Sequence, residues 1–367
     1  MRLVAKRHRP LVVINDKVIT CHFGKIYLLD VESGKAEFIC KLPVSNIKIV
    51  LSRFRFFERL LRIEARTAVA LDDTHILLSM DGKTYCIDIT NGKTECEYSY
   101  RNSMSNPRRM CRIEGIEGFD NCIAYGEYLL NSKRTKPSGI FVRSLDKADW
   151  KMVFEFPAGE IRHIHSLVPS KKSNCVYILT GDLDSESGIW EAKDNFETVT
   201  PIVKGSQMYR SGSLYETDEG FIYPTDTALE QNYIYYLEKD KTNNSLVSKV
   251  VTDMDGSCVS SVQTADKVLV STTVEADESI RGWKSWINMK KGPGIKSDYA
   301  QLLSVDKATL KSKKIIQFKK DFLPYKLFQY GHIKIYDLPS KHAVLIYPIG
   351  VKKYDGNLLE LKYGELE

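Results

Sequence analysis

The sequence has few of the features that quickly assign a chain of 367 residues to a class of protein. It contains no run of about 18 uncharged apolar residues, and no apolar stretch of signal-peptide length follows the basic residues near its start. We therefore expect a soluble protein of the cytoplasm. The net charge is only +6 and is spread along the chain, which is too weak to indicate a nucleic acid as the main partner.

Cysteine motifs and helical patterns are missing as well. The eight cysteines include no C-x-x-C pair and show no regular spacing, which is typical of reduced, half-buried thiols. This excludes a disulfide framework and a cysteine-rich zinc site. Apolar residues seldom recur at helical spacing, and a hydrophobic content of 43% excludes disorder as the main state. What remains is a pattern of short strands.

One unit recurs along the chain: an apolar strand, a turn containing Asp, Gly, Asn or Lys, and a second strand. Two further strands precede each copy. The spacing between successive copies is about 45 to about 66 residues, the range of four-stranded propeller blades. The seven copies begin at Lys25, Thr84, Gly139, Gly188, Tyr233, Tyr299 and Gly356.

The repeat predicts an all-β fold, a seven-bladed β-propeller of four-stranded antiparallel blades that spans residues 1–367 as a single domain. The last copy leaves little room for a fourth strand. We therefore expect an N-terminal segment within residues 1–15 to supply that strand and close the ring, which removes exposed sheet edges. A stack of β-sandwiches is the alternative, and seven copies of one hairpin make it the weaker one.

Two stretches break the strand pattern. Residues 52–66 predict an amphipathic helix with Phe54 and Phe57 on one face and arginines such as Arg55 and Arg59 on another. Such a helix can bind a membrane surface or a protein partner, although more often its apolar face packs on its own domain. Residues 276–298 form a basic, Trp-containing insertion that could cover one face of the disc.

Polar residues collect at equivalent places in successive repeats, where propellers place their ligand residues. The ends of the second strands supply Tyr125, Glu127, Asp182 and Asp226. The inner strands supply His163, His165, Gln207, Tyr209 and Arg210, while Glu230 and Asn232 enter the following hairpin. The candidate site therefore lies in repeats three to five.

His163 and His165 are two residues apart on a predicted strand, so both side chains face the same way. The pair could bind a divalent metal ion with a further ligand from Gln207, Glu127 or Asp182. It could equally hold a carboxylate-bearing sugar or act as acid or base near neutral pH. A third interpretation is that the two rings only fill the channel with hydrogen bonds.

The carboxylates leave similar alternatives. Glu127, Asp182, Asp226 and Glu230 could provide the acid and base of a glycoside hydrolase, which needs two carboxyl groups on either side of a sugar. Asp and Glu that follow strands also commonly cap turns.

The hairpin at residues 139–150 resembles a degenerate Asp-box, the Ser-x-Asp-x-Gly-x-x-Trp motif of sialidase-like propellers, and the hairpin from Gly188 is a weaker second copy. Residues 105–235 resemble largely uncharacterised sialidase-like (BNR repeat) propellers of bacteria and archaea that are linked to surface polysaccharides. The resemblance implies carbohydrate binding. The chain differs from true sialidases because it has no Phe/Tyr-Arg-Ile-Pro motif and no assignable arginine triad. Seven-bladed polysaccharide lyases offer a second analogy.

We therefore expect a carbohydrate-active propeller that binds an acidic oligosaccharide or polysaccharide and can cleave it as a lyase or as a glycosidase. In a lyase, Tyr125 or His163 would transfer the proton while His165 and Arg210 neutralise the carboxylate. In a hydrolase, Glu127 would act with Asp182 or Asp226, and Arg210 and Gln207 would position the sugar. The alternative is a non-catalytic platform for polysaccharide biosynthesis, with membrane or protein contact through residues 52–66.

Overall fold

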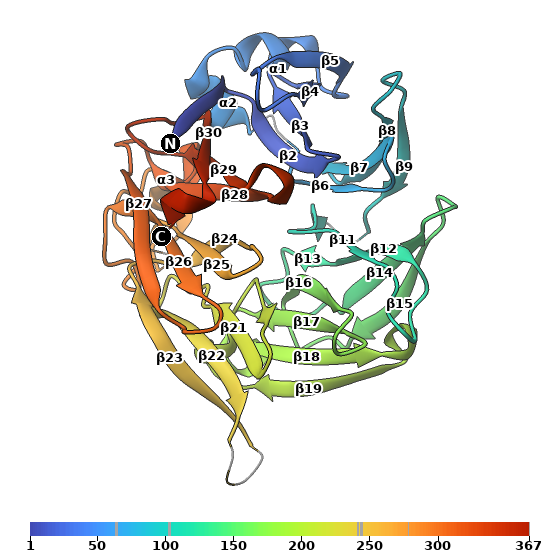
Figure 1. Ribbon diagram of the computed structural model, residues 1–367, viewed down its shortest axis with the longest axis vertical. Helices are drawn as coiled ribbons and strands as arrows, with labels where there is room; N and C mark the ends of the chain where they lie inside the picture. The colour runs from blue at the N-terminus through green and yellow to red at the C-terminus, as the bar shows by residue number, and fades with distance from the viewer. Residues whose placement is uncertain (63–64, 102–103, 241, 243–244, 278, 367) are drawn as a thin grey trace. The chain divides into compact units, whose positions relative to one another are not determined.

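The computed structural model describes residues 1–62, 65–101, 104–240, 242, 245–277 and 279–366, and its regular structure consists mostly of antiparallel strands, with few helices (Figure 1). Seven sheets have four strands each, and they are the blades of a seven-bladed β-propeller. The predicted fold class is confirmed. None of the helices in these residues is long and apolar enough to cross a membrane.

The contacts divide the described chain into two compact units, which we call the central unit (residues 65–214) and the terminal unit (residues 1–64 and 215–367). That residues 1–367 form a single domain stays a prediction.

The central unit contains blades two, three and four. Blade two consists of β6 (Thr67–Ala70), β7 (His75–Met80), β8 (Lys83–Asp88) and β9 (Thr94–Ser99). Blade three consists of β11 (Cys111–Ile113), β12 (Cys122–Gly126), β14 (Ser138–Ser144) and β15 (Trp150–Phe156). Blade four consists of β16 (His163–Ser170), β17 (Cys175–Gly181), β18 (Gly188–Lys193) and β19 (Thr198–Lys204). A small extra sheet pairs β10 (Met104–Ser105) with β13 (Tyr128–Leu129).

The terminal unit contains the other four blades. Blade one consists of β2 (Arg9–Ile14), β3 (Lys17–His22), β4 (Lys25–Leu29) and β5 (Ala36–Lys41). Blade five consists of β20 (Tyr215–Glu216), β21 (Gly220–Pro224), β22 (Asn232–Lys239) and β23 (Leu246–Met254). Blade six consists of β24 (Cys258–Gln263), β25 (Lys267–Thr272), β26 (Tyr299–Asp306) and β27 (Ser312–Lys319). Blade seven consists of β28 (His332–Leu338), β29 (Ala343–Ile349), β30 (Asn357–Lys362) and β1 (Arg2–Lys6).

The seven predicted hairpin copies are the third strands of the blades, from β4 to β30, so the repeat is confirmed strand by strand. Several of their turns contain the same local hydrogen bond. The carboxylates of Asp30, Asp88 and Asp306 each accept a hydrogen bond of 2.7–2.8 Å from the backbone N–H of a Ser or Thr two or three residues further on. This Asx-type turn explains why Asp marks the hairpins in the sequence.

Strands in the middle of the blades are buried on both faces, and every residue of β17 and β29 is buried. The cause is that neighbouring blades within each unit pack face to face. In the central unit, Ile140 of blade three and Trp190 of blade four belong to one apolar cluster. In the terminal unit, Val18 of blade one and Leu345 of blade seven share another. Strands of this kind are continuously apolar, so polar side chains are confined to their ends.

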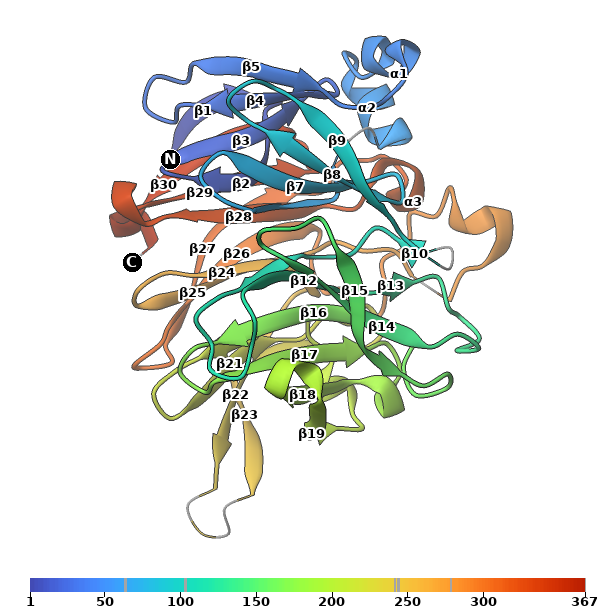
Figure 2. The same cartoon turned by 90° about the vertical axis from the view of Figure 1, so that its right-hand side faces the viewer.

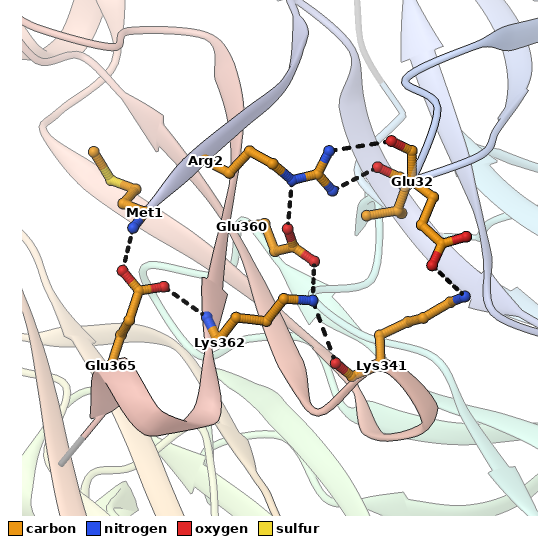
Figure 3. A pocket seen from close by; sticks show the side chains of 8 residues that line it. Met1, Arg2, Glu32, Lys341, Glu360, Lys362 and Glu365 are labelled. Carbon is orange, nitrogen blue, oxygen red and sulfur yellow. Dashed lines mark hydrogen bonds and ion pairs between the residues drawn. The ribbon is translucent and has the colours of Figure 1, made fainter.

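The N-terminal strand β1 completes blade seven by pairing antiparallel with β30, as predicted. Val4 is buried against the apolar cluster of blades seven and one. At the surface, Arg2 Nε lies 2.6 Å from Glu360 Oε2, and the amino group of Met1 pairs with Glu365 (Figure 3). Strand pairing, burial and ion pairs together hold the two ends of the chain side by side.

The helix predicted over residues 52–66 is shorter than predicted, and the interpretation in which its apolar face packs on its own domain is wrong. Two short helices form, α1 (Asn46–Leu51), which Ser45 caps, and α2 (Arg55–Leu61). Arg59 is buried whereas Phe54 is 62% exposed, so the arginine face packs inward and the aromatic face points outward. Residues 63–64 of the predicted helix, and residue 278 of the second insertion, lie outside the described residues.

The docking of β1 can be tested with a matched pair of substitutions. Val4→Asp should lower the free energy of unfolding by at least about 3 kcal/mol, because it buries an unpaired carboxylate. Leu3→Asp, at the neighbouring exposed position, should change it by less than about 1 kcal/mol. Urea unfolding followed by tryptophan fluorescence measures both, and equal effects would contradict the burial of Val4 between β1 and the apolar cluster of blades seven and one.

Candidate functional site

Blade four brings two histidines to the start of its first strand. In the pairing of β16 with β17, His163 lies opposite Gly181 and Ile164 opposite Thr180, but the register then moves to Ser166. His165 is the extra residue of this β-bulge. Bulges redirect side chains and often occur beside functional sites. Blades one and six have the same irregularity in their first strands, where Leu11 and Val259 take the place of His165.

The tautomers of both histidines follow from their neighbours. Nδ1 of His163 lies 3.2 Å from the carbonyl oxygen of Leu129, and Nδ1 of His165 lies 3.1 Å from that of Ser211. Because a carbonyl oxygen can only accept, each Nδ1 must carry a proton. In a neutral ring, Nε2 is then a bare lone pair.

Both lone pairs face one carboxylate. Asp182 follows the last residue of β17, and its Oδ1 lies 3.4 Å from Nε2 of His163 and 3.5 Å from Nε2 of His165. Gly181 permits this approach, since a Cβ there would come within 3.1 Å of both His165 Cε1 and Arg210 Cγ. Nε2 of His163 is buried and has no hydrogen-bond partner among the described residues.

Two arginines complete the surroundings of Asp182. Arg162 Nη1 lies 2.7 Å from Oδ2, and Arg210 Nη2 lies 3.2 Å from Oδ1. Arg210 Nη1 also donates to the Asp182 carbonyl oxygen at 3.1 Å, as does Gln207 Nε2 at 2.9 Å. We call Arg162, His163, His165, Asp182 and Arg210 the Asp182 cluster.

Burial and charge act in opposite directions on the titrating groups. Burial alone would raise the pKa of Asp182, but the two histidine rings, which donate to its carboxylate when they are protonated at Nε2, and the Arg210 guanidinium hold that pKa well below its usual range. Burial lowers the pKa of His163, and the nearby Asp182 carboxylate offsets this only in part. The cluster therefore contains an ionised carboxylate, two guanidinium groups and a neutral His163 near neutral pH.

Two members of the cluster are partly exposed to solvent. The histidines are only 2% exposed, while the side chain of Arg162 is 30% exposed and that of Asp182 13%. The ring of Tyr128 stacks on His163 with 4.0 Å between centroids, and the guanidinium of Arg66 lies 5.2 Å from the centre of the Tyr128 ring. The sequence analysis assigns no role to Tyr128 or Arg162, although each adjoins a residue that it assigns to the site.

Two of the predicted site residues in this unit, Tyr125 and Glu127, contact other residues of the protein core. Tyr125 is 1% exposed and stacks on Phe141 in an aromatic cluster, and its burial strongly raises its pKa. Glu127 is fully buried, and its two carboxylate oxygens accept from Arg101 at 2.9 and 3.1 Å and from the Gly139 N–H at 2.8 Å. Both carboxylate oxygens of Glu127 are therefore already paired within the protein.

The segment from Gln207 to Tyr209 forms a short 3-10 helix, η3, rather than the inner strand that the sequence suggested. The helix begins after Ser206, whose hydroxyl accepts from the Met208 N–H at 3.2 Å. It places Gln207 and Arg210 beside Asp182, while Tyr209 is half-buried at its end.

The remaining predicted residues, Asp226, Glu230 and Asn232, lie in the terminal unit. Asn232 is buried and organises the loop after β21, donating to the Thr227 carbonyl oxygen at 2.7 Å and accepting from the Thr227 N–H at 3.0 Å. Asp226 is buried, and Glu230 is exposed. The Asp182 cluster is thus built within the central unit alone.

The cluster has the donor set of a divalent metal site. The ligand atoms of His163, His165 and Asp182 all lie within 4.8 Å of one another. Two ligand atoms at about 2.1 Å from one ion are about 3.4 Å apart at the tetrahedral angle, which is close to the two Nε2–Oδ1 distances. Two imidazoles and one carboxylate suit divalent transition metals and leave coordination positions open.

No protein-family model matches the chain, and no curated protein matches it in sequence. Solved structures do match in fold. Oligogalacturonate lyase from Vibrio parahaemolyticus has a TM-score of 0.53 and 10% identity, with 94% of this chain and 86% of that chain covered. The CNH domain of AfRom2 has a TM-score of 0.54 and 8% identity, with 97% and 94% covered. These similarities define the class of protein as a β-propeller.

A prolyl endopeptidase has a TM-score of 0.51 and 10% identity, with 98% of this chain covered. The present chain spans only 50% of the length of that endopeptidase. Since proteins with such different names share the blades, the likeness shows the fold alone.

The role of Asp182 in the cluster predicts a large difference between two neighbouring carboxylates. Asp182→Asn should lower the free energy of unfolding by about 3 kcal/mol, because two partly buried guanidinium groups lose their counter-charge. Asp184→Asn changes an exposed carboxylate of the same loop and should have an effect below about 0.5 kcal/mol. Chemical unfolding of chelator-treated protein at neutral pH provides the comparison. Similar values for the two variants would show that Asp182 does not neutralise the cluster.

Proposed function

We propose that the protein is a carbohydrate-active propeller whose Asp182 cluster binds an acidic glycan together with a divalent metal ion. The observation that supports this most is the convergence of the His163 and His165 Nε2 atoms on one oxygen of Asp182. With neutral rings, two lone pairs would face an anion with nothing between them. A cation at this point removes that repulsion.

The charge of the cluster supports an acidic ligand. Arg162, Arg210 and Asp182 together carry a net charge of +1 when the histidines are neutral, and a divalent ion would raise it to +3. A centre with this positive charge attracts an anion. Arginine binds carboxylates well because its planar guanidinium group matches their geometry. The Nε atoms of Arg162 and Arg210 are buried without a hydrogen-bond partner among the described residues. We infer that metal and acidic glycan bind cooperatively.

Among cleavage reactions, elimination suits the cluster better than hydrolysis. A hydrolase needs one carboxyl group that can give up a proton, but the pKa of Asp182 is strongly lowered and Glu127 is held by Arg101. Elimination needs the uronate carboxylate to be neutralised, so that the proton on the adjacent carbon becomes acidic. A metal ion and two arginines meet that requirement.

Metal binding is the first test. Titration of chelator-treated protein with Mn²⁺ or Zn²⁺ should show one site, and His163→Ala or His165→Ala should weaken it at least about tenfold, because each removes a ligand. His342→Ala, which changes an exposed histidine of the terminal unit, should leave the affinity unchanged. Wild-type protein that binds neither ion, or histidine variants that bind as well as wild type, would refute the metal site.

Glycan recognition is the second test, and oligogalacturonate is the first ligand to try because the name of one structural neighbour specifies it. With the metal present, the protein should bind oligogalacturonate but not its methyl ester, since only the free acid has a carboxylate. Arg162→Gln and Arg210→Gln should each weaken binding at least about tenfold, since each removes a charge-assisted hydrogen bond. Calorimetry measures the affinities.

The control for this test is Arg112→Gln, which changes an arginine of the same unit that pairs with Glu114 and should leave affinity unchanged. Equal affinity for acid and ester would contradict recognition of the carboxylate. If the glycan is cleaved, an unsaturated product with its ultraviolet absorbance marks elimination, and reducing ends without that absorbance mark hydrolysis.

A non-catalytic binding platform is the second candidate function. It is favoured by the burial of the two histidines, which leaves less room for a sugar ring than an open cleft does. In that case the cluster would bind metal and an acidic group without turnover, and the glycan titration would show affinity with no product.

A further inference from the structure

The segments of the terminal unit that interrupt the blades carry a concentration of exposed apolar side chains. Eleven large apolar residues in three segments are 37–78% exposed, and single exposed residues elsewhere need no explanation whereas contiguous ones do. We call these residues the apolar rim. They are Ile47, Val50, Phe54, Phe56, Phe57 and Leu61 of α1 and α2, Trp283, Trp286, Ile287 and Met289 of the loop after β25, and Phe322.

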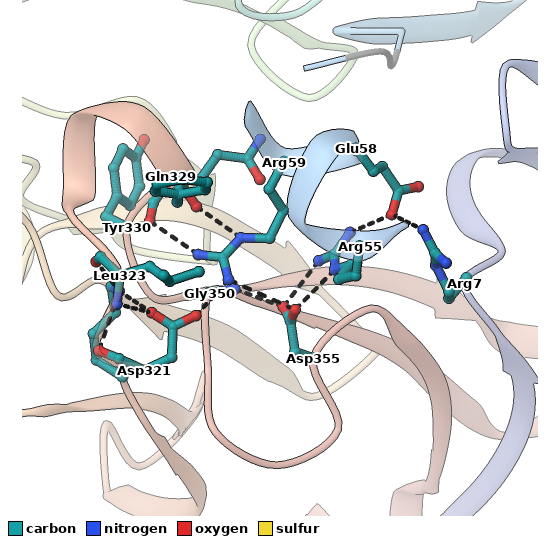
Figure 4. Close-up of polar contacts among 12 residues, drawn as sticks. Arg7, Arg55, Glu58, Arg59, Asp321, Leu323, Gln329, Tyr330, Gly350 and Asp355 are labelled. Atoms are coloured by element: carbon teal, nitrogen blue, oxygen red, sulfur yellow. Dashed lines mark hydrogen bonds and ion pairs between the residues drawn. The ribbon is translucent and has the colours of Figure 1, made fainter. Parts of the chain in front are cut away.

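The arginine face of α2 keeps the aromatic face outward. Arg55 binds Asp355 through Nε and Nη2 at 2.8 and 2.9 Å, and Glu58 accepts from Arg7 at 2.7 Å (Figure 4). Arg59 is 3% exposed, donates to the Phe328 carbonyl oxygen at 2.7 Å and pairs with Asp321.

With one face of α2 fixed by these ion pairs, the helical period turns Phe54, Phe57 and Leu61 toward solvent. A short helix that only had to cover its own domain would bury its aromatic residues and expose its arginines. The opposite arrangement points to an apolar environment outside the protein.

The three segments of the rim meet at α3 (Tyr325–Phe328). The rings of Phe56 and Phe328 lie 4.6 Å apart, and Arg62 Nη2 donates to the Lys326 carbonyl oxygen at 2.6 Å. Lys326 in turn reaches the other insertion, donating to Ser285 Oγ at 2.9 Å and lying 5.1 Å from the centre of the Trp286 ring. Figure 2 shows α1, α2, α3 and this loop on the same side of the terminal unit.

Basic residues are interspersed with the apolar ones. Residues 279–291 contain four basic residues and no acidic one. Residues 45–62 contain five basic residues and one acidic residue, Glu58, which is already paired with Arg7 and Arg55. Lys48, Lys284 and Lys326 are exposed within the rim. Lys290 and Lys291 are paired with Asp277 and Asp298, and Arg55 and Arg59 with Asp355 and Asp321, so the positive charge of the rim comes from the remaining basic residues, Lys48 and Lys284 among them.

We propose that the apolar rim docks on a membrane surface that contains anionic lipids, with its Trp and Phe side chains at the headgroup boundary. Aromatic residues with a polar or charged neighbour prefer this region. Lys and Arg side chains are attracted electrostatically to anionic headgroups. A protein interface is a poorer match because the core of such interfaces is depleted in lysine. Helices of six and seven residues lie on a bilayer, since crossing it takes about 20 residues.

Sedimentation with lipid vesicles tests the proposal. Wild-type protein should bind vesicles of phosphatidylcholine mixed with phosphatidylglycerol and bind pure phosphatidylcholine much more weakly. The double variant Trp283→Ser/Trp286→Ser should lose at least about tenfold in partition coefficient, because two aromatic side chains no longer insert. Lys48→Glu/Lys284→Glu should lose a similar factor on the mixed vesicles.

The matched control is Leu130→Ser/Val250→Ser, which removes two exposed apolar residues outside the rim, 73% and 56% exposed, and should bind as wild type does. A second readout needs no variant. Trp283 and Trp286 are 69% and 50% exposed whereas Trp190 is buried, so vesicles should shift the fluorescence of the wild-type protein to shorter wavelength.

Three results would overturn the proposal: no binding to the mixed vesicles, equal binding to both vesicle types, or loss of binding in the control variant that matches the loss in the rim variants. Self-association that the rim variants abolish, without vesicle binding, would assign the surface to a second copy of the chain instead. Rim variants should still bind metal and soluble glycan normally, which separates this proposal from the function of the Asp182 cluster.

Discussion

The constraint on which the rest of the structure depends is that every blade must bury both of its faces. A four-stranded sheet packed on both sides leaves little room for charged groups along its most buried strands, and the fully buried β17 and β29 carry no charged side chain. Ionisable groups are therefore pushed to strand ends and to the segments between blades. The Asp182 cluster lies at the end of β17, and the apolar rim is formed by segments that belong to no blade.

The two buried carboxylates of the central unit show how similar chemistry leads to different roles. Glu127 is matched by Arg101 and a backbone N–H, so its acceptors are satisfied and it stabilises the fold. Asp182 is surrounded by several donors and cations, and Nε2 of His163 and the Nε atoms of Arg162 and Arg210 have no hydrogen-bond partner among the described residues. A site that its own residues do not complete is the kind that a ligand can complete.

Sequence reasoning could predict what depends on local pattern. The hairpin repeat predicted the blades, because turns with Asp and runs of apolar residues depend on residues that are neighbours in the sequence. The short last repeat predicted that β1 closes the ring. It also brought His163, His165, Asp182 and Arg210 into one group. The features that sequence reasoning missed depend on the register of strand pairing and on partner residues that are distant in the chain.

The bulge at His165 leaves no mark in the sequence, because Leu11 and Val259 occupy it elsewhere. The burial of Tyr125 depends on Phe141, a residue of the neighbouring strand. The orientation of α2 depends on Asp321 and Asp355, some 260 to 300 residues further along the chain. An amphipathic pattern shows that the two faces of a helix differ in polarity. Which face packs inward depends on the acidic residues that the helix contacts.

The pairing of β1 with β30 joins residues that are 358 positions apart, as in the contact between Arg2 and Glu360. Closing so long a loop costs chain entropy that no local contact offsets, so this pairing belongs to the last events of folding. Until it forms, β30 is an open edge available to strands of other molecules. The order of assembly therefore makes blade seven the point where folding and self-association compete.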